Sequence, residues 1–117
     1  MIHVYLDDFR PCPKGFVHAA NAEECILLLD ECDIDVLSLD YDLGWHAPTG
    51  LDIVRHMIAH SRYAKTIYLH SSSAIGRQKM YELLYLHKPE AVQLFMHAMP
   101  LELLRRIADE TSNNKRA

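Results

Sequence analysis

Two patterns of hydrophobic and polar positions alternate along the chain. Short, mostly apolar runs occupy positions 2–6, 16–19, 34–39, 66–69 and 92–96. Between them lie longer segments in which apolar residues recur every three or four positions, over 22–32, from 49, over 74–87 and from 100. Because strands of parallel sheets are buried on both faces and amphipathic helices bury one, the runs predict strands and the periodic segments predict helices.

Residues that favour helix starts stand in front of each periodic segment. Asn21 and Thr49 each precede a segment directly, and Ser72 or Ser73 precedes the third. Their side-chain oxygens can accept hydrogen bonds from the unpaired N–H groups of a helix's first turn. Pro100 suits the first turn of the last helix, where its missing N–H is not needed. These signals agree with the helix starts that the apolar pattern indicates.

The alternation of strands and helices predicts an α/β domain: a five-stranded, mainly parallel sheet with helices on both faces. One connection departs from this plan. Only seven residues separate Asp8 from Phe16, and they include Pro11, Pro13 and Gly15. A crossover connection needs about a dozen residues in all, and a helix does not tolerate proline in its interior. We therefore expect a loop in place of the first helix of a regular strand–helix array.

The chain length of 117 residues is that of one domain. We expect this domain to cover residues 1–111, and the polar segment 112–117 to form a frayed tail. Apolar residues make up 50% of the chain, which is enough for one hydrophobic core.

Charge and cysteine usage exclude several classes of protein. The net charge is −4, and the 12 lysines and arginines form no run longer than two residues, so the sequence gives no sign of a surface for duplex nucleic acid. The longest purely apolar stretch, residues 25–29, is too short to span a membrane. Three cysteines without a CxxC motif argue against a disulfide framework. We expect a reduced, cytoplasmic protein, whose oligomeric state the sequence leaves open.

Ionisable side chains follow three of the predicted strands. Asp7 and Asp8 follow the first strand, Asp40 follows the third, and His70 follows the fourth. In parallel α/β sheets ligands bind beyond the carboxyl ends of the strands, so we expect these side chains to converge. Converging carboxylates repel each other unless a cation neutralises them, and oxygen ligands favour Mg²⁺, Mn²⁺ or Ca²⁺. We predict a divalent metal site, with Mg²⁺ first, on Asp7, Asp8 and Asp40; the alternative is that each is a turn or capping residue.

The segment after the fourth strand offers groups that suit phosphate chemistry. His70 lies beside the predicted acidic cluster, which should favour its charged form and keep its pKa near physiological pH, as general acid–base catalysis requires. Ser71, Ser72 and the first N–H groups of the next helix can bind a phosphate. Arg77 can add a bidentate contact, and Arg10 is the weaker arginine candidate. The alternative is that His70 makes only structural hydrogen bonds and Arg77 is a surface charge.

Several of these segments together resemble a known family. They are LDDFRP at residues 6–11, SLDYDLG at 38–44, Thr49 with Gly50, and HSSSAIGR at 70–77. The combination is similar to the response-regulator receiver domain, and more closely to its divergent branch, the cyclic-phosphate processing receiver-like family. The resemblance implies a flavodoxin-like sheet of strand order 2-1-3-4-5 with a metal at the first and third strands. It also implies activity on cyclic phosphates, such as a cyclic phosphodiester at a nucleotide or RNA end.

One position departs from the signalling receivers that the chain resembles. Those receivers phosphorylate the aspartate at the position of Asp40 and use a lysine after the fifth strand. Here the corresponding segment, residues 95–100, reads FMHAMP and contains no lysine. The departure weakens the interpretation of Asp40 as a phosphoacceptor. His97 in this segment either supplies a positive charge or only ends the strand.

Three functions are open at this point. The first is metal-dependent hydrolysis of a cyclic phosphate or related phosphoester, with His70 and Asp40 as catalytic residues. The second is a signalling module in which Asp40 accepts a phosphoryl group, and the third is a phosphate sensor without turnover. In every case the partner is a phosphate-containing small molecule or a nucleotide end. Substrate choice depends on loops 8–15 and 43–49, where Trp45 covers the pocket, stacks on a base or anchors its loop.

Overall fold

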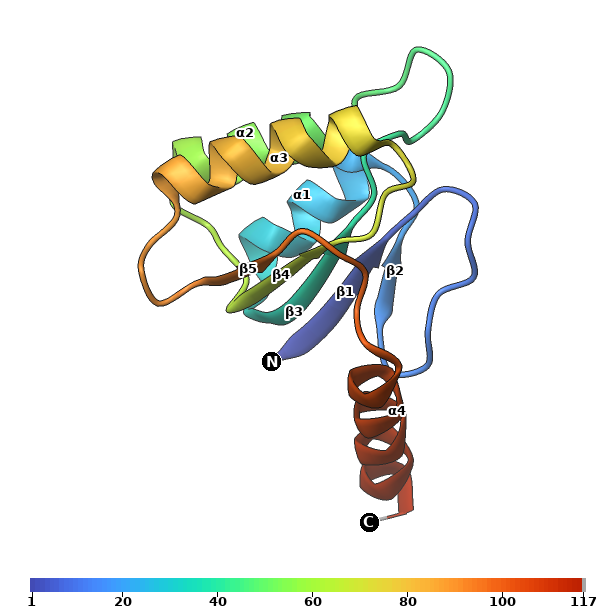
Figure 1. The fold of residues 1–117 in the computed structure, drawn as a ribbon. Coiled ribbons are helices and arrows are strands. Elements are labelled where there is room, and N and C mark those ends of the chain that lie inside the picture. The colour runs from blue at the N-terminus through green and yellow to red at the C-terminus, as the bar shows by residue number, and fades with distance from the viewer. Residues whose placement is uncertain (117) are drawn as a thin grey trace.

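The computed structural model describes residues 1–116, which form a five-stranded sheet and four helices (Figure 1). The strands are β1 (Ile2–Leu6), β2 (Val17–Ala19), β3 (Ile34–Leu39), β4 (Thr66–Leu69) and β5 (Gln93–Phe95). The helices are α1 (Ala22–Glu31), α2 (Gly50–His60), α3 (Ala74–His87) and α4 (Leu101–Arg116). Each element expected from the apolar pattern is therefore present.

The order of the strands determines where a ligand can bind. All strand pairs are parallel, and the order across the sheet is β2-β1-β3-β4-β5, which confirms the flavodoxin-like topology. The chain passes from β1 to its neighbour β2 through residues 7–16 without a helix, as the prolines predicted. It then crosses to β3 on the other side of β1. The direction of the strand order thus switches at β1, beside the carboxyl ends of β1 and β3.

Side-chain caps fix where three of the helices begin. Asn21 caps α1 by accepting a hydrogen bond from the first turn. Thr49 caps α2 in a reciprocal capping box with Asp52. Ser73, rather than Ser72, caps α3. Helices α2 and α3 therefore start at the carboxyl edge of the sheet, next to the predicted site.

The two faces of the sheet are covered differently. Helices α1, α2 and α3 lie on one face and enclose the larger hydrophobic core (Figure 1). Along each strand successive side chains point to opposite faces, so a second, smaller core forms on the other face. Its buried members are Tyr5, Val36, Tyr68, Met99 and Ile107. Part of the loop after β1 and part of α4 cover this face, where a regular array would have its first helix.

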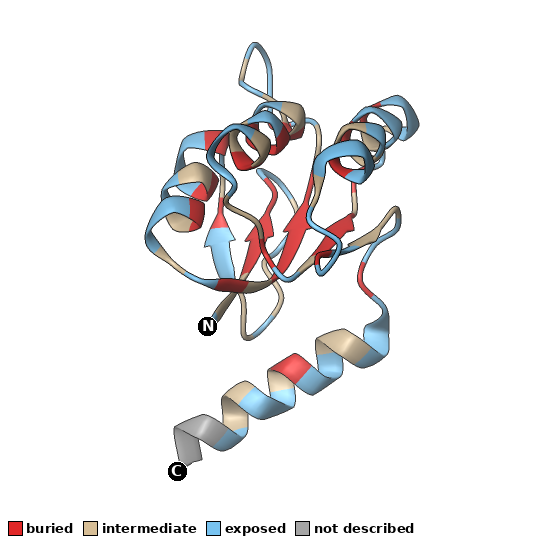
Figure 2. Ribbon diagram, turned by 90° about the vertical axis from the view of Figure 1, so that its left-hand side faces the viewer, coloured by how far each residue is buried: buried red, intermediate tan, exposed pale blue. Residues whose placement is uncertain are grey.

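Helix α4 extends away from the sheet (Figure 2). It is anchored near its middle, where the side chains of Ile107 and Thr111 lie against Gly15 of the loop after β1. The segment expected to form a frayed tail continues this helix as far as Arg116, and Ala117 lies outside the described residues. No helix within residues 1–116 is both long and apolar enough to cross a membrane.

Candidate functional site

The backbone brings three predicted site residues together. The N–H of Asp7 donates to Ala19 of β2, the N–H of Asp40 donates to Leu6 of β1, and the N–H of His70 donates to Leu39 of β3, at 3.0 to 3.1 Å. The hydrogen bonding of the sheet thus continues one residue past each strand. As a result, one side-chain ligand atom from each of Asp7, Asp40 and His70 lies within 4.8 Å of the other two. The predicted convergence of these strand ends is confirmed.

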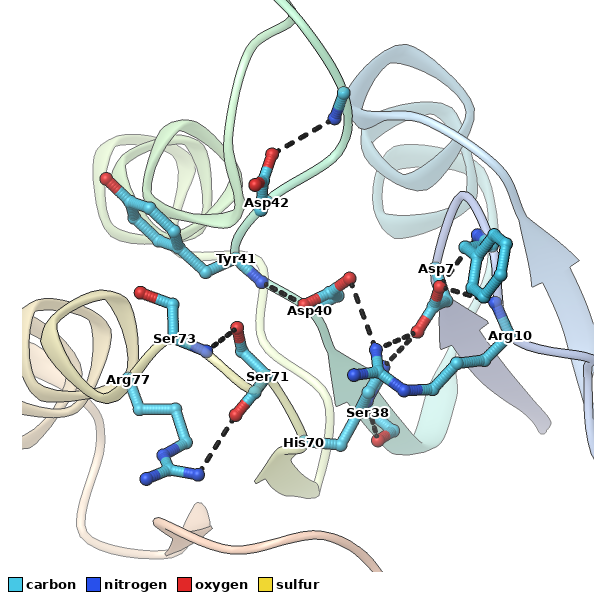
Figure 3. A network of polar contacts seen from close by, with 12 residues as sticks. Asp7, Arg10, Ser38, Asp40, Tyr41, Asp42, His70, Ser71, Ser73 and Arg77 are labelled. Carbon is cyan, nitrogen blue, oxygen red and sulfur yellow. Dashed lines mark hydrogen bonds and ion pairs between the residues drawn. The ribbon is translucent and has the colours of Figure 1, made fainter.

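Asp7 is the most heavily hydrogen-bonded carboxylate of the site (Figure 3). Its Oδ1 accepts the backbone N–H groups of Phe9 and Arg10, each at 2.8 Å. Its Oδ2 accepts Nη1 of Arg10 at 2.8 Å and lies 2.9 Å from Nε2 of His70. Burial by itself would raise the pKa of Asp7, but the hydrogen bonds from Arg10, Phe9 and His70 outweigh it and lower this pKa to about 2. Asp7 is therefore a fixed negative charge.

Asp40 is also buried but has fewer partners. Its side chain is 7% exposed, and its Oδ1 accepts the backbone N–H of Tyr41 at 2.8 Å. Burial raises the pKa of Asp40, the hydroxyl of Ser71 opposes this change, and the charge of Asp7 adds to it. Asp40 therefore holds a proton more readily than an exposed aspartate does, whereas Asp7 holds one less readily.

Arg10 supplies the positive charge of the site. Its Nη1 lies 2.8 Å from Asp7 Oδ2 and 3.5 Å from Asp40 Oδ2, so one guanidinium bridges the two carboxylates. The side chain is 40% exposed and reaches the cluster from the loop after β1. From sequence Arg10 was the weaker arginine candidate, yet it is the arginine that contacts the acidic residues. Its spacing of three from Asp7, in a loop too short for a helix, is the signal that was available.

His70 lies beneath the carboxylates rather than facing solvent. Its side chain is 5% exposed, and its ring stacks on Tyr5 with the centroids 4.5 Å apart. Nε2 contacts Asp7, and Nδ1 lies 2.6 Å from the hydroxyl of Ser38. Asp7 and Asp40 favour the charged ring, as expected, but burial outweighs them and lowers the pKa of His70, so the expectation that the charged form dominates is wrong. A neutral ring that donates through Nε2 and accepts from Ser38 satisfies both contacts.

Ser38 is a site residue that the sequence did not predict. It is a fully buried hydroxyl within an otherwise apolar part of β3, and that break in the apolar run was its only signal. In the sheet Ser38 pairs with Tyr5 of β1 and Tyr68 of β4, so it lies on the face where the His70 ring stacks. It thereby holds the imidazole in place.

The predicted phosphate ligands have different surroundings. Ser71 is buried, and its Oγ accepts the N–H of Ser73 at 3.1 Å. Arg77 donates from Nη1 to the carbonyl of Ser71 at 3.0 Å, so both residues stabilise the turn before α3. Figure 3 places the guanidinium of Arg77 away from the Asp7–Asp40 cluster. Ser72 is exposed and lines a pocket beside the cluster.

This pocket has a volume of about 350 Å³ and opens over the acidic residues. Its lining comes from three loops at the carboxyl edge and consists of Asp8, Phe9, Arg10, Asp40, Asp42, Gly44 and Ser72. Asp8 is exposed on the wall of the pocket and is not one of the three residues with converging ligand atoms. Of the predicted metal ligands, the structure therefore brings Asp7 and Asp40 together with His70, and leaves Asp8 at the side.

Comparison with known proteins agrees with this geometry. No curated protein matches the chain. Residues 2–86, which include β1 to β4 and every site residue described above, match the family described as Cyclic-phosphate processing Receiver domain. The sheet order and the acidic strand ends are those that the resemblance implied. The chain therefore belongs to the family of cyclic-phosphate processing receiver domains.

Proposed function

We propose that this receiver domain hydrolyses a cyclic phosphodiester with the help of a divalent cation, at a nucleotide or RNA end. The observation that carries the proposal is the convergence of Asp7, Asp40 and His70 within 4.8 Å, beside a pocket with an arginine in its wall. This combination can bind a metal and a phosphate at neighbouring points.

The donors of the site fit a hard divalent cation. Asp7 and Asp40 offer carboxylate oxygens, and Asp8 and Asp42 add two more carboxylates at the pocket. Among the lining residues only Arg10 opposes these four negative charges, so a cation that enters is favoured electrostatically. Oxygen donors of this kind suit Mg²⁺ better than softer metals. When bound, the cation would supply Lewis-acid polarisation of a phosphoryl oxygen.

The protein's own residues bind and orient the phosphate. Arg10 is long and partly exposed, and its guanidinium can pair with two phosphate oxygens at once. Ser72 adds a hydroxyl at the pocket wall, and α3 starts one residue after Ser73 with unpaired N–H groups in its first turn. Arg77 and Ser71 hold this turn in position, which is an indirect contribution to phosphate binding.

Asp40 is the residue we assign to proton transfer, and His70 acts through Asp7. In the reaction the oxygen of water bonds to phosphorus, one ring P–O bond breaks, and the proton released by water ends on the alkoxide oxygen that leaves. Asp40 lines the pocket, and an oxygen of its carboxylate that does not bind the cation can take and return this proton. His70 has both nitrogens engaged by Asp7 and Ser38, so it fixes the orientation of Asp7.

Phosphoacceptor signalling through Asp40 is the second candidate. It is ranked second because, among the described residues, none from β5 or the segment after it lines the pocket. His97 is exposed, and its Nδ1 contacts the carbonyl of Ala98 at 2.8 Å rather than an acidic residue. Arg10 approaches the carboxylates from the loop after β1 instead.

The proposal is tested by incubating the full chain with a nucleoside 2′,3′-cyclic phosphate and Mg²⁺ and following the products by ³¹P NMR. We expect the cyclic phosphate to become a phosphomonoester, and chelation by EDTA to stop the reaction. Asp40→Asn should lower the rate about 100-fold or more, whereas Asp109→Asn on the exposed face of α4 should not change it. No conversion with Mg²⁺, Mn²⁺ or Ca²⁺, together with a mass increase on Asp40 after treatment with acetyl phosphate, would favour the signalling function instead.

A further inference from the structure

Two aromatic side chains at the pocket are almost fully exposed. Phe9 is 92% exposed and Trp45 is 90% exposed, and no other large apolar side chain described as exposed reaches these values. Phe9 lines the acidic pocket, and Trp45 directly follows Gly44, which also lines it. Single exposed apolar residues are common on protein surfaces. An exposed aromatic residue in the lining of a polar pocket, with a second one residue beyond that lining in the neighbouring loop, is a feature of ligand sites.

Carboxylates at the pocket hold the backbone at Phe9 and at Gly44, the residue before Trp45. The N–H of Phe9 donates to Asp7 Oδ1 at 2.8 Å. The N–H of Gly44 donates to Asp42 Oδ1 at 3.2 Å, and Gly44 has a φ of +115°, which favours glycine. The two rings are therefore presented to solvent by an ordered backbone, without being buried by it. This arrangement fixes binding groups before a ligand arrives.

The rings and the pocket together match the two parts of a nucleotide. Arg10 and Ser72 offer donors for a phosphate, while Phe9 and Trp45 offer flat apolar faces a short way along the chain. Nucleobases stack on such faces, and stacking needs a base that is not already paired in a duplex. We propose that Phe9 and Trp45 form a stacking platform for the base of an unpaired nucleotide whose cyclic phosphate enters the acidic pocket. This inference rests on the function proposed above.

This platform makes the enzyme selective for nucleotides over other cyclic phosphates. Every base has a π-face, so the platform distinguishes a substrate with a base from one without a base, and discriminates little among the bases. The same chemistry favours a single-stranded RNA end or a free nucleotide over a duplex end.

The chain contains one tryptophan, Trp45, so its fluorescence reports directly on the platform. We expect a nucleoside 2′,3′-cyclic phosphate with Mg²⁺ to quench this fluorescence, and glycerol 1,2-cyclic phosphate, which has no base, to leave it unchanged. In turnover assays Phe9→Ala and Trp45→Ala should each lower the ratio of kcat/KM for the nucleotide to kcat/KM for the base-free substrate about tenfold. Tyr85→Ala, which removes an exposed aromatic residue of α3 outside the pocket, should leave this ratio unchanged.

The outcomes separate this inference from the proposed function. If both substrates are hydrolysed with equal kcat/KM, and neither Phe9→Ala nor Trp45→Ala changes these values, the platform is overturned and the proposed hydrolysis is supported. Quenching by the nucleotide alone, without hydrolysis of either substrate, would support the platform and overturn the reaction. An equal fall in this ratio of kcat/KM values in Tyr85→Ala would also overturn the platform.

Discussion

The ends of β1 and β3 carry the same side chain at the same edge of the sheet, and their surroundings differ. At the end of β1, Asp7 accepts hydrogen bonds from two backbone N–H groups and from Arg10, and contacts His70. At the end of β3, Asp40 accepts one backbone N–H and lies 3.5 Å from Arg10. Both side chains are buried, so the hydrogen bonds to Asp7 and the negative charge that Asp7 places beside Asp40 decide the direction of each pKa change. Asp7 organises the site, and Asp40 is free to react.

The largest expected effect comes from removing the charge of Asp7. Asp7→Asn leaves the buried His70 and the partly exposed Arg10 without their charged partner, which should lower the free energy of unfolding by about 2 to 3 kcal/mol, because solvent screens part of the charge of Arg10. Urea denaturation measures this loss. The matched control is Asp42→Asn, an exposed aspartate of the same edge, which should stay within about 0.5 kcal/mol of the wild type. Equal losses in the two variants would remove the distinction between the strand ends.

Lowering the pH should reveal how much the ionised carboxylate of Asp7 contributes to the free energy of unfolding, without a mutation. Because the pKa of Asp7 is about 2 in the folded protein and 3.8 in the unfolded chain, its stabilisation is fully present above about pH 4 and is lost as the pH falls towards 2. The loss amounts to about 2 kcal/mol at 1.36 kcal/mol per pKa unit. It is measured by urea denaturation of metal-free protein at a series of pH values. If the difference in stability between wild type and Asp7→Asn stays constant from pH 4 to 2, Asp7 is not the group responsible.

The smallest effect on stability is expected at Asp40. Burial and the charge of Asp7 both disfavour its ionised form, so Asp40→Asn should be at least as stable as the wild type at neutral pH. The same substitution removes a proposed metal ligand and should weaken Mg²⁺ binding about tenfold or more, as calorimetric titration would measure. A variant that unfolds as easily as Asp7→Asn, or that binds Mg²⁺ normally, would contradict the division of roles.

Much of this arrangement could be predicted from the chain, and the parts that could not depend on contacts between distant residues. Asp7 and Asp40 were predictable because strand ends follow from local apolar runs, and parallel strands end at one edge. The direction of the pKa change of His70 was not predictable, because the burial of this side chain depends on Tyr5 and Ser38 from two other strands. Arg10 was underestimated because the path of an irregular loop does not follow from periodicity.

The direction in which α4 extends from the sheet could not be predicted from the sequence pattern either. Its apolar positions predict a helix that packs against the sheet, but the pattern does not say how far along the helix that packing extends. In the structure the buried Ile107 lies near the middle of α4, while Leu101 at its start is exposed. The contact with Gly15 depends on the loop that replaces the first helix, which is a feature of another part of the chain.

The direction of α4 also has a consequence for how this domain can be joined to others. Figure 1 shows the N-terminus at the amino edge of the sheet and α4 running away from the carboxyl edge. A protein fused to the N-terminus is therefore tethered on the side of the sheet opposite the carboxyl edge. A fluorescent reporter or an affinity handle can be attached there while the loops that carry Phe9 and Trp45 stay open to solvent.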